Sequence, residues 1–159
     1  MRYIAYTDGS YRDTPIGGVY GSAAVVAREG ADDCIKLTRA SQDEFSSMRN
    51  VAGEVMAVIN LLDYCANELH LTKDDTVIVH HDYIGISNWV KPVGDKNFWR
   101  AKNRLTQSYR HDVVDVYSNQ FNIEFVHTPG HKGIHGNELV DVLAADAINT
   151  YVRGKMKTE

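Results

Sequence analysis

Four acidic residues interrupt or border apolar stretches of the sequence, where a charged side chain does not help folding: Asp8, Glu54, Asp82 and Asp141. Asp8 and Asp82 end short β-rich runs, and ligands of α/β proteins bind at the carboxyl ends of strands. Glu54 and Asp141 lie at the edges of apolar helical stripes, where a lone carboxylate is costly. Four carboxylates brought together repel one another unless hard divalent cations bind between them. Two Mg²⁺ ions about 3.5–4 Å apart would support in-line displacement at phosphorus.

Each of these acids also has an ordinary structural explanation when it is taken alone. Asp8 begins Asp-Gly-Ser, which is common in turns, and Asp82 could cap a following helix. Glu54 could pair with a lysine or arginine at the rim of its helix, and Asp141 could be a surface acid favoured by the helix dipole. The metal hypothesis therefore depends on all four acids meeting at one edge of a sheet.

The elements that must position the acids follow from hydrophobic periodicity. Strands are predicted at residues 2–10, 19–28, 34–39, 76–82 and 121–127, and helices at 51–69, 84–90, 98–117 and 138–152. The first three strands form an antiparallel meander, and residues 11–15 form a loop. Helices on both sides of residues 76–82 indicate a parallel strand reached by a right-handed crossover. The pattern predicts an α/β fold, with one domain over residues 1–153 and a polar tail at 154–159.

Composition narrows the classes of function. A chain of 159 residues with a formal charge of −4 does not hold nucleic acid by overall electrostatics, so binding would need a local basic patch or metal ions. Cys34 and Cys65 form no disulfide framework or metal motif, which fits a reducing cytoplasmic setting. No apolar run approaches 18 residues and no signal-peptide pattern opens the chain, so we expect no membrane partner.

Five short segments resemble those of type 1 ribonucleases H. They are Tyr-Thr-Asp-Gly-Ser at 6–10, Asn-Val-Ala-Gly-Glu at 50–54, His-His-Asp at 80–82, Thr-Pro-Gly-His at 128–131 and Gly-Asn-Glu-Leu-Val-Asp at 136–141. The resemblance implies a five-stranded mixed sheet flanked by helices, with strands 1–3 antiparallel and strands 4 and 5 parallel to strand 1. It implies a monomeric endonuclease that cleaves the RNA strand of RNA–DNA hybrids and leaves 3′-hydroxyl and 5′-phosphate ends.

The resemblance also implies roles for the candidate catalytic residues. Two Mg²⁺ ions would be bound, with Mn²⁺ as a substitute, and Asp8 would bridge them. Asp141 would help to hold the ion that activates the attacking water, and Glu54 and Asp82 would hold the ion on the leaving-group side. His131, in a glycine-rich loop, matches a family histidine linked to product or metal release.

Contacts to the substrate are implied for Gly9, Ser10 and Asn50. The first two lie where the family approaches the 2′-hydroxyls that distinguish RNA from DNA, and Asn50 matches an asparagine that touches the hybrid. The chain departs from the family here, because Arg49 replaces a second asparagine and Tyr83 follows the third acid in place of serine. The loop at 11–15 is also altered. These departures affect substrate contacts rather than the acids.

A basic segment, residues 89–110, contains six lysines and arginines against Asp95, which gives a net local charge of about +5. Trp89, Phe98 and Trp99 are interleaved with these charges. We expect three cations to follow the phosphates of the DNA strand: Lys96, Arg100 and Lys102. The alternative is a solvated helix face with Trp99 in the core.

Three further interpretations remain open at this stage. His127, His131 and His135 have a spacing that could suggest zinc, but Pro129 and Gly130 would break the helix needed to align them. The same fold could serve a resolvase-like or integrase-like DNA nuclease. The chain could also be a nucleic-acid-binding module without catalysis, or a domain with a purely structural Mg²⁺ or Ca²⁺ site.

Overall fold

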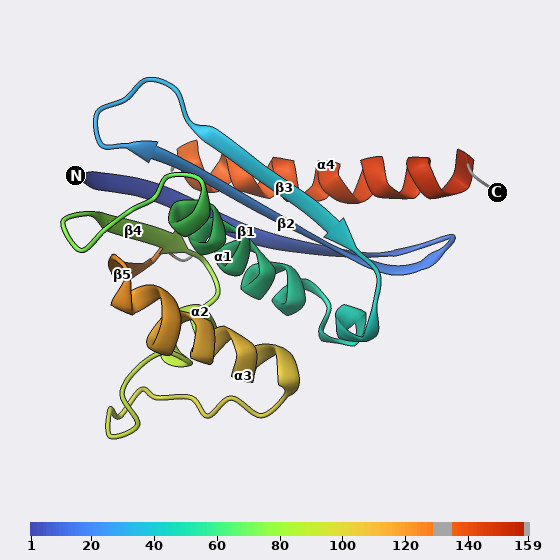
Figure 1. The fold of residues 1–159 in the computed structure, drawn as a ribbon. Helices are drawn as coiled ribbons and strands as arrows, with labels where there is room; N and C mark the ends of the chain where they lie inside the picture. Colours follow the sequence, from blue (N-terminus) through green and yellow to red (C-terminus); the bar gives the residue numbers. More distant parts are fainter. Residues whose placement is uncertain (129–134, 158–159) are drawn as a thin grey trace.

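A mixed five-stranded sheet organises the computed structural model, which describes residues 1–128 and 135–157 (Figure 1). Its strands are β1 (Arg2–Thr14), β2 (Gly17–Arg28), β3 (Ile35–Ser41), β4 (Thr76–His81) and β5 (Asn122–His127). Their order is β3-β2-β1-β4-β5. The first three strands are antiparallel, and β4 and β5 run parallel to β1. The predicted fold class is confirmed.

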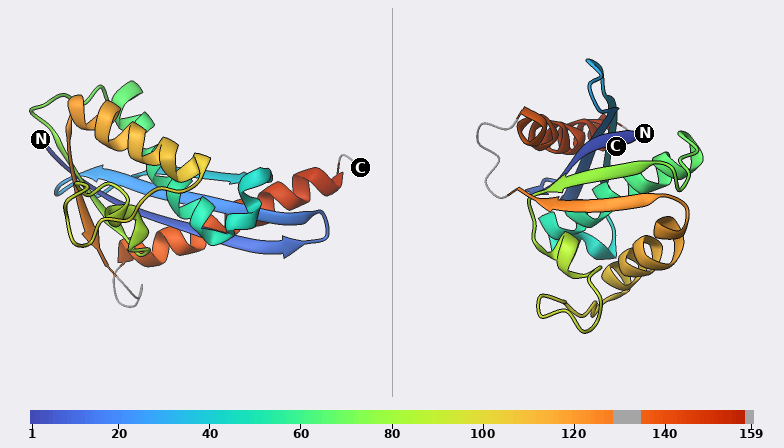
Figure 2. Two further views of the ribbon diagram at one scale, coloured as in Figure 1. Left: turned by 90° about the horizontal axis from the view of Figure 1, so that it is seen from below. Right: turned by 90° about the vertical axis from the view of Figure 1, so that its left-hand side faces the viewer.

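Helices cover both faces of this sheet. Helix α4 (His135–Lys157) packs on one face of β1, β2 and β3, and α1 (Asn50–Asn67) packs on the other (Figure 2). Beyond α1 lies α3 (Arg104–Arg110), which continues through a π-helical segment and a 3₁₀ turn. A four-residue helix, α2 (Gly85–Asn88), follows β4, and a 3₁₀ turn over Glu44–Met48 precedes α1.

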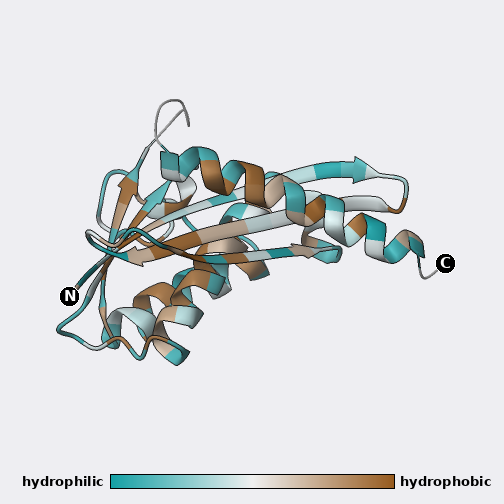
Figure 3. Ribbon diagram, turned by 90° about the horizontal axis from the view of Figure 1, so that it is seen from above, coloured by the Kyte–Doolittle hydropathy of each residue, from teal (hydrophilic) through white to brown (hydrophobic). Residues whose placement is uncertain are grey.

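The main core fills the space between the sheet and α1. The predicted stripe of α1 is buried there, at Val55, Val58, Leu62 and Cys65. On the opposite face, every fourth residue of α4 from Val140 to Val152 is buried. Hydrophobic and hydrophilic residues alternate along α4, as expected of a helix with one buried stripe (Figure 3). Within residues 1–128 and 135–157, no helix is both long and apolar enough to cross a membrane.

The first strand is longer than predicted. It was expected to end at Asp8-Gly9-Ser10, but β1 continues to Thr14, so residues 11–14 are strand rather than loop. The cause is the hairpin with β2, whose pairing runs from Tyr3↔Arg28 to Thr14↔Gly17. Pairing with β4 ends much earlier, at Tyr6. Asp8 therefore lies beyond the parallel part of the sheet although it does not end its strand.

The third and the last of the expected helices also differ from the predictions in their bounds. The helix expected from residue 98 begins at Arg104, because Asn103 caps it by accepting a 2.9 Å hydrogen bond from the Thr106 backbone N–H. The last helix, expected over residues 138–152, spans His135–Lys157, so residues 154–157 of the expected polar tail are helical. Glu138 occupies the first turn of α4, and Asp141 falls in the second.

Candidate active site

Asp8 lies where β1 loses one of its two neighbours. Its backbone still pairs with Ala23 of β2, but β4 pairs with β1 only as far as Tyr6. Asp8 is 2% exposed. The backbone N–H of Gly9 donates a 2.9 Å hydrogen bond to its Oδ1. A buried acid is thus placed at a rigid point of the sheet.

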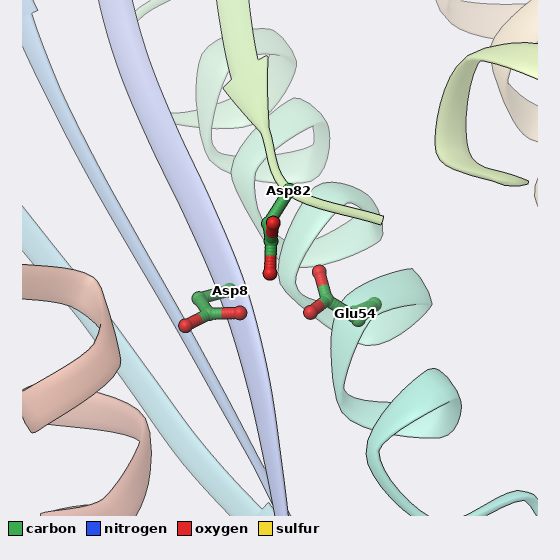
Figure 4. Close-up of side chains that lie close together, drawn as sticks. All are labelled: Asp8, Glu54 and Asp82. Atoms are coloured by element: carbon green, nitrogen blue, oxygen red, sulfur yellow. The ribbon is translucent and has the colours of Figure 1, made fainter. Parts of the chain in front are cut away.

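Glu54 and Asp82 complete a carboxylate group with Asp8 (Figure 4). Glu54 belongs to the second turn of α1 and is 2% exposed, while Asp82 follows β4 directly and is half-buried. One oxygen from each carboxylate lies within 4.8 Å of the others. Three acids far apart in sequence are therefore brought together by a strand, a helix and a strand end.

The electrostatics of Glu54 show what this arrangement costs. Burial raises the pKa of Glu54 well above its usual range, and a hydrogen bond with Asp8 and the charges of Asp8 and Asp82 raise it further. The backbone N–H of Gly9 opposes the shift. The Oε2 atom of Glu54 is buried and has no hydrogen-bond partner among the described residues. A hard divalent cation fits these residues, because it would ligate that oxygen and offset the repulsion.

Two histidines hold the backbone that carries Asp82. The Nε2–H of His127 donates a 2.7 Å hydrogen bond to the carbonyl oxygen of Asp82, and Nδ1 of His81 lies 3.0 Å from that of Tyr83. Burial lowers the pKa of His81 to about 4, so its ring is neutral at pH 7. No role at this site was predicted for His81 from the sequence. Strand alternation could have shown that it faces inward beside Asp82.

Asp141 and His131 are not joined to this group by the structure. Among the described residues, the acids close enough to share an ion are those of the carboxylate group, and Asp141 is exposed on α4. Its helix nevertheless runs along β1: Gly136 packs on Tyr6, two residues before Asp8, and Ala144 packs on β2 opposite residue 10. His131 lies outside the described residues.

The candidate substrate residues border the carboxylate group on two sides. Ser10 continues β1 beyond it, and Asn50 is the exposed first residue of α1. Arg49 precedes α1 with a φ of 57°, a left-handed conformation that is uncommon for a non-glycine residue. Its guanidinium lies 5.7 Å from the centroid of the Tyr11 ring. A cation thus stands where the family has an asparagine.

The basic segment is exposed but is not a helix face. Residues 98–103 lack regular structure, and Lys96, Arg100 and Lys102 are exposed. A surface cavity of about 530 Å³ is lined by Trp89, Phe98, Trp99, Arg100, Lys102, Asn103 and Thr106. Trp99 is 37% exposed, so the alternative of a solvated helix with Trp99 in the core is wrong.

Arg110 differs from Lys96, Arg100 and Lys102 because it is only partly exposed. Its Nη1 donates hydrogen bonds of 2.7 and 2.8 Å to the carbonyl oxygens of Trp89 and Lys91. Its guanidinium also lies 5.2 Å from the centroid of the Phe98 ring. Arg110 therefore serves to hold the segment together, and the charge available to a ligand is smaller than the sequence suggested.

A mixed sheet with helices on both faces and a buried carboxylate group at the divergence of β1 and β4 defines a nuclease of the ribonuclease H type. The RNase H family model matches residues 1–149, and the chain belongs to that family, as a type 1 ribonuclease H. It is 30% identical to the ribonuclease H of Francisella tularensis subsp. novicida over 151 residues, which cover 92% of this chain and 91% of the relative. It is 26% identical to that of Dinoroseobacter shibae, with coverage of 97% and 96%.

Solved structures show the same fold at lower identity. RNase H1 of the archaeon Halobacterium salinarum superimposes with a TM-score of 0.72 at 17% identity, covering 94% of this chain and 99% of that chain. LC11-RNase H1, solved in complex with an RNA/DNA hybrid, also gives a TM-score of 0.72, at 22% identity and the same coverage. These structures support the fold, and the match to the RNase H family identifies the chain as a nuclease.

Proposed function

We propose that this chain is a divalent-metal-dependent endonuclease that cleaves the RNA strand of RNA–DNA hybrids and leaves 3′-hydroxyl and 5′-phosphate ends. The observation that carries the proposal is the convergence of Asp8, Glu54 and Asp82 within 4.8 Å, with two of the three buried. Burial and the neighbouring acids raise the pKa of Glu54, so keeping these carboxylates ionised in the fold costs free energy unless cations bind to them. The related LC11 enzyme, solved with an RNA/DNA hybrid, supports the choice of substrate.

The four acids and His131 would have different roles, set by their positions in the fold. Asp8 would help to hold both of two Mg²⁺ ions, and Glu54 and Asp82 would hold the one on the leaving-group side. Asp141, on the helix that runs along β1, would serve the side of the attacking water. When bound, the ions would supply a nucleophile at neutral pH and charge stabilisation for the leaving oxygen. His131 would assist release of product.

The substrate would be read on both sides of the carboxylate group. The backbone of Gly9 and Ser10 would lie near the 2′-hydroxyls of the RNA strand, and the side chain of Asn50 would touch the hybrid. The exposed cations Lys96, Arg100 and Lys102 would follow the phosphates of the DNA strand.

We further propose one catalytic domain over residues 1–153 that acts as a cytoplasmic monomer. The family match to residues 1–149 supports the domain, and the free thiols of Cys34 and Cys65 fit a reducing compartment. Sedimentation of the purified chain tests the oligomeric state.

A cleavage assay separates this function from its alternatives. End-labelled RNA–DNA hybrid, double-stranded DNA and double-stranded RNA are incubated with protein and Mg²⁺ or Mn²⁺, and the product ends are mapped. Asp8→Asn should lose at least about 10³-fold in rate. Asp146→Asn, at an exposed position of α4, is the matched control and should keep full activity. Cleavage of duplex DNA would favour the resolvase-like alternative, and hybrid binding without cleavage the non-catalytic one.

A further inference from the structure

Strand β1 and helix α1 touch through backbone atoms next to the carboxylate group. A Cβ atom added to Gly9 would lie 2.2 Å from the backbone nitrogen of Glu54 and 2.4 Å from the carbonyl carbon of Gly53. A Cβ atom added to Gly53 would lie 2.2 Å from the carbonyl oxygen of Gly21 and 2.9 Å from the Cα of Gly9. Real side chains do not approach backbone so closely, so both positions require glycine.

Glycine is required at positions 9 and 53 because other backbone atoms lie close to them, and not because of an unusual backbone conformation. Gly17 and Gly30 have positive φ, whereas Gly9 and Gly53 do not. Gly53 lies inside α1, where glycine costs about 1 kcal/mol relative to alanine. Gly154, inside α4, shows the contrast, because a Cβ atom added to it would meet no other atom within 4 Å. The cost at Gly53 is therefore offset by close contact of α1 with β1 and β2.

We propose that the contact between Gly9 and Gly53 sets the spacing of Asp8 and Glu54, and thereby the size of the cation that the site prefers. The inference rests on the proposed metal-binding function. Each glycine is the immediate sequence neighbour of one of the acids, so their contact fixes the spacing of the two backbone positions that carry the carboxylates. Gly9 and Gly53 are positioning residues, since they act through Asp8 and Glu54.

The size of the expected displacement follows from the contact distances. To relieve a 2.2 Å contact, an added methyl group must push α1 from the sheet by roughly 1 Å. Glu54 would move with the helix, while Asp8 and Asp82 would stay on the sheet. Mg²⁺ requires ligands at about 2.0–2.1 Å in a strict octahedron, whereas Ca²⁺ accepts about 2.3–2.6 Å in flexible geometries. A wider site therefore loses Mg²⁺ before it loses Ca²⁺.

The test is the metal-dependent rise in melting temperature of Gly53→Ala, titrated separately with Mg²⁺ and Ca²⁺ after treatment with EDTA. We expect apparent Mg²⁺ affinity to fall about tenfold or more and Ca²⁺ affinity to fall less, so that their ratio shifts toward Ca²⁺. Gly154→Ala controls for helix propensity and should change neither affinity. Leu62→Ala, buried in α1 two turns beyond Glu54, controls for lost stability and should leave the ratio unchanged.

An unchanged ratio in a folded Gly53→Ala protein would overturn the inference, as would the same shift in Leu62→Ala. If Gly53→Ala does not fold, Gly9→Ala tests the same contact from the strand, and the same shift is expected. A wild-type protein that neither ion stabilises would count instead against the proposed metal function. The two failures are thus distinguishable.

Discussion

The carboxylate group and the basic segment hold their charges in opposite ways. Asp8 and Glu54 are each 2% exposed, on elements packed in the centre of the fold. Lys96, Arg100 and Lys102 are exposed on a stretch with no regular structure. A buried charge cannot relax when its partner is removed, whereas an exposed cation can be replaced by its neighbours or by salt. Substitutions should therefore act in an all-or-none manner at the first region and in gradual steps at the second.

The largest effect is expected from Glu54→Gln. The variant keeps the shape of the side chain but removes an anionic ligand, so we expect the cleavage rate to fall by at least about 10³-fold at saturating hybrid. Stabilisation of the protein by Mg²⁺ should also be strongly reduced. Single-turnover cleavage and Mg²⁺-dependent melting measure the two effects. A fall in cleavage rate of less than tenfold would mean that the carboxylate group tolerates substitution as well as the basic segment does.

The same variant should stabilise the protein when metal is absent. Because folding raises the pKa of Glu54, wild-type stability falls as the pH rises above the unfolded value of about 4.3 and through the folded value. Glu54→Gln lacks this loss, so in EDTA it should be more stable than wild type near pH 7. Below pH 4 the difference should vanish. Urea unfolding at a series of pH values measures it, and equal stability at pH 7 would contradict it.

The contrast between the regions also explains what the sequence predicted. Asp8, Glu54 and Asp82 were found because each interrupts an apolar pattern, and such interruptions are visible in a single sequence. The start of α3 was missed because residues 98–103 are organised by tertiary contacts. The backbone N–H of Trp99 donates a 3.0 Å hydrogen bond to the carbonyl oxygen of Asn88, and the Arg110 guanidinium lies over the Phe98 ring. Periodicity carries no signal for such contacts.

The end of β1 was missed for a related reason. Asp-Gly-Ser has the composition of a turn, but hairpin pairing with β2 extends the strand to Thr14. The position of Asp141 relative to the carboxylate group could not be predicted either, since it depends on how α4 crosses the sheet. The tight contact of Gly9 and Gly53 was equally hidden, although a glycine inside a helical pattern is itself a signal of close packing.

The second effect in size concerns the basic segment. The triple variant Lys96→Ala, Arg100→Ala and Lys102→Ala should weaken hybrid binding by about 10- to 100-fold at low salt. The slope of the logarithm of the binding constant against the logarithm of the salt concentration (the salt slope) should become shallower by up to about three. Cleavage at saturating hybrid should stay within a few-fold of wild type, because the carboxylate group is untouched. Binding titrations at several salt concentrations measure this slope. An unchanged slope would mean that these cations do not contact the phosphates.

A smaller effect is expected from Arg110→Met. The variant keeps the apolar stem but loses both hydrogen bonds to the carbonyls of Trp89 and Lys91, which should cost about 1–3 kcal/mol of unfolding free energy. Lys102→Met, at an exposed site, is the control and should cost less than about 0.5 kcal/mol. Urea unfolding compares them. If Arg110→Met left stability intact but lowered the salt slope by one, Arg110 would belong with the phosphate-binding cations.

The smallest effect is expected where the basic segment meets the turn before α1. Arg104 forms an ion pair with Glu44, and the two side chains are 71% and 63% exposed. Solvent and salt screen such a pair, so a double-mutant cycle with Arg104→Gln and Glu44→Gln should give a coupling of about 0.2–0.5 kcal/mol that disappears in high salt. A coupling above about 1.5 kcal/mol would mean that this part of the surface is as rigidly organised as the carboxylate group. Its substitutions would then act in the all-or-none manner expected only of buried charges.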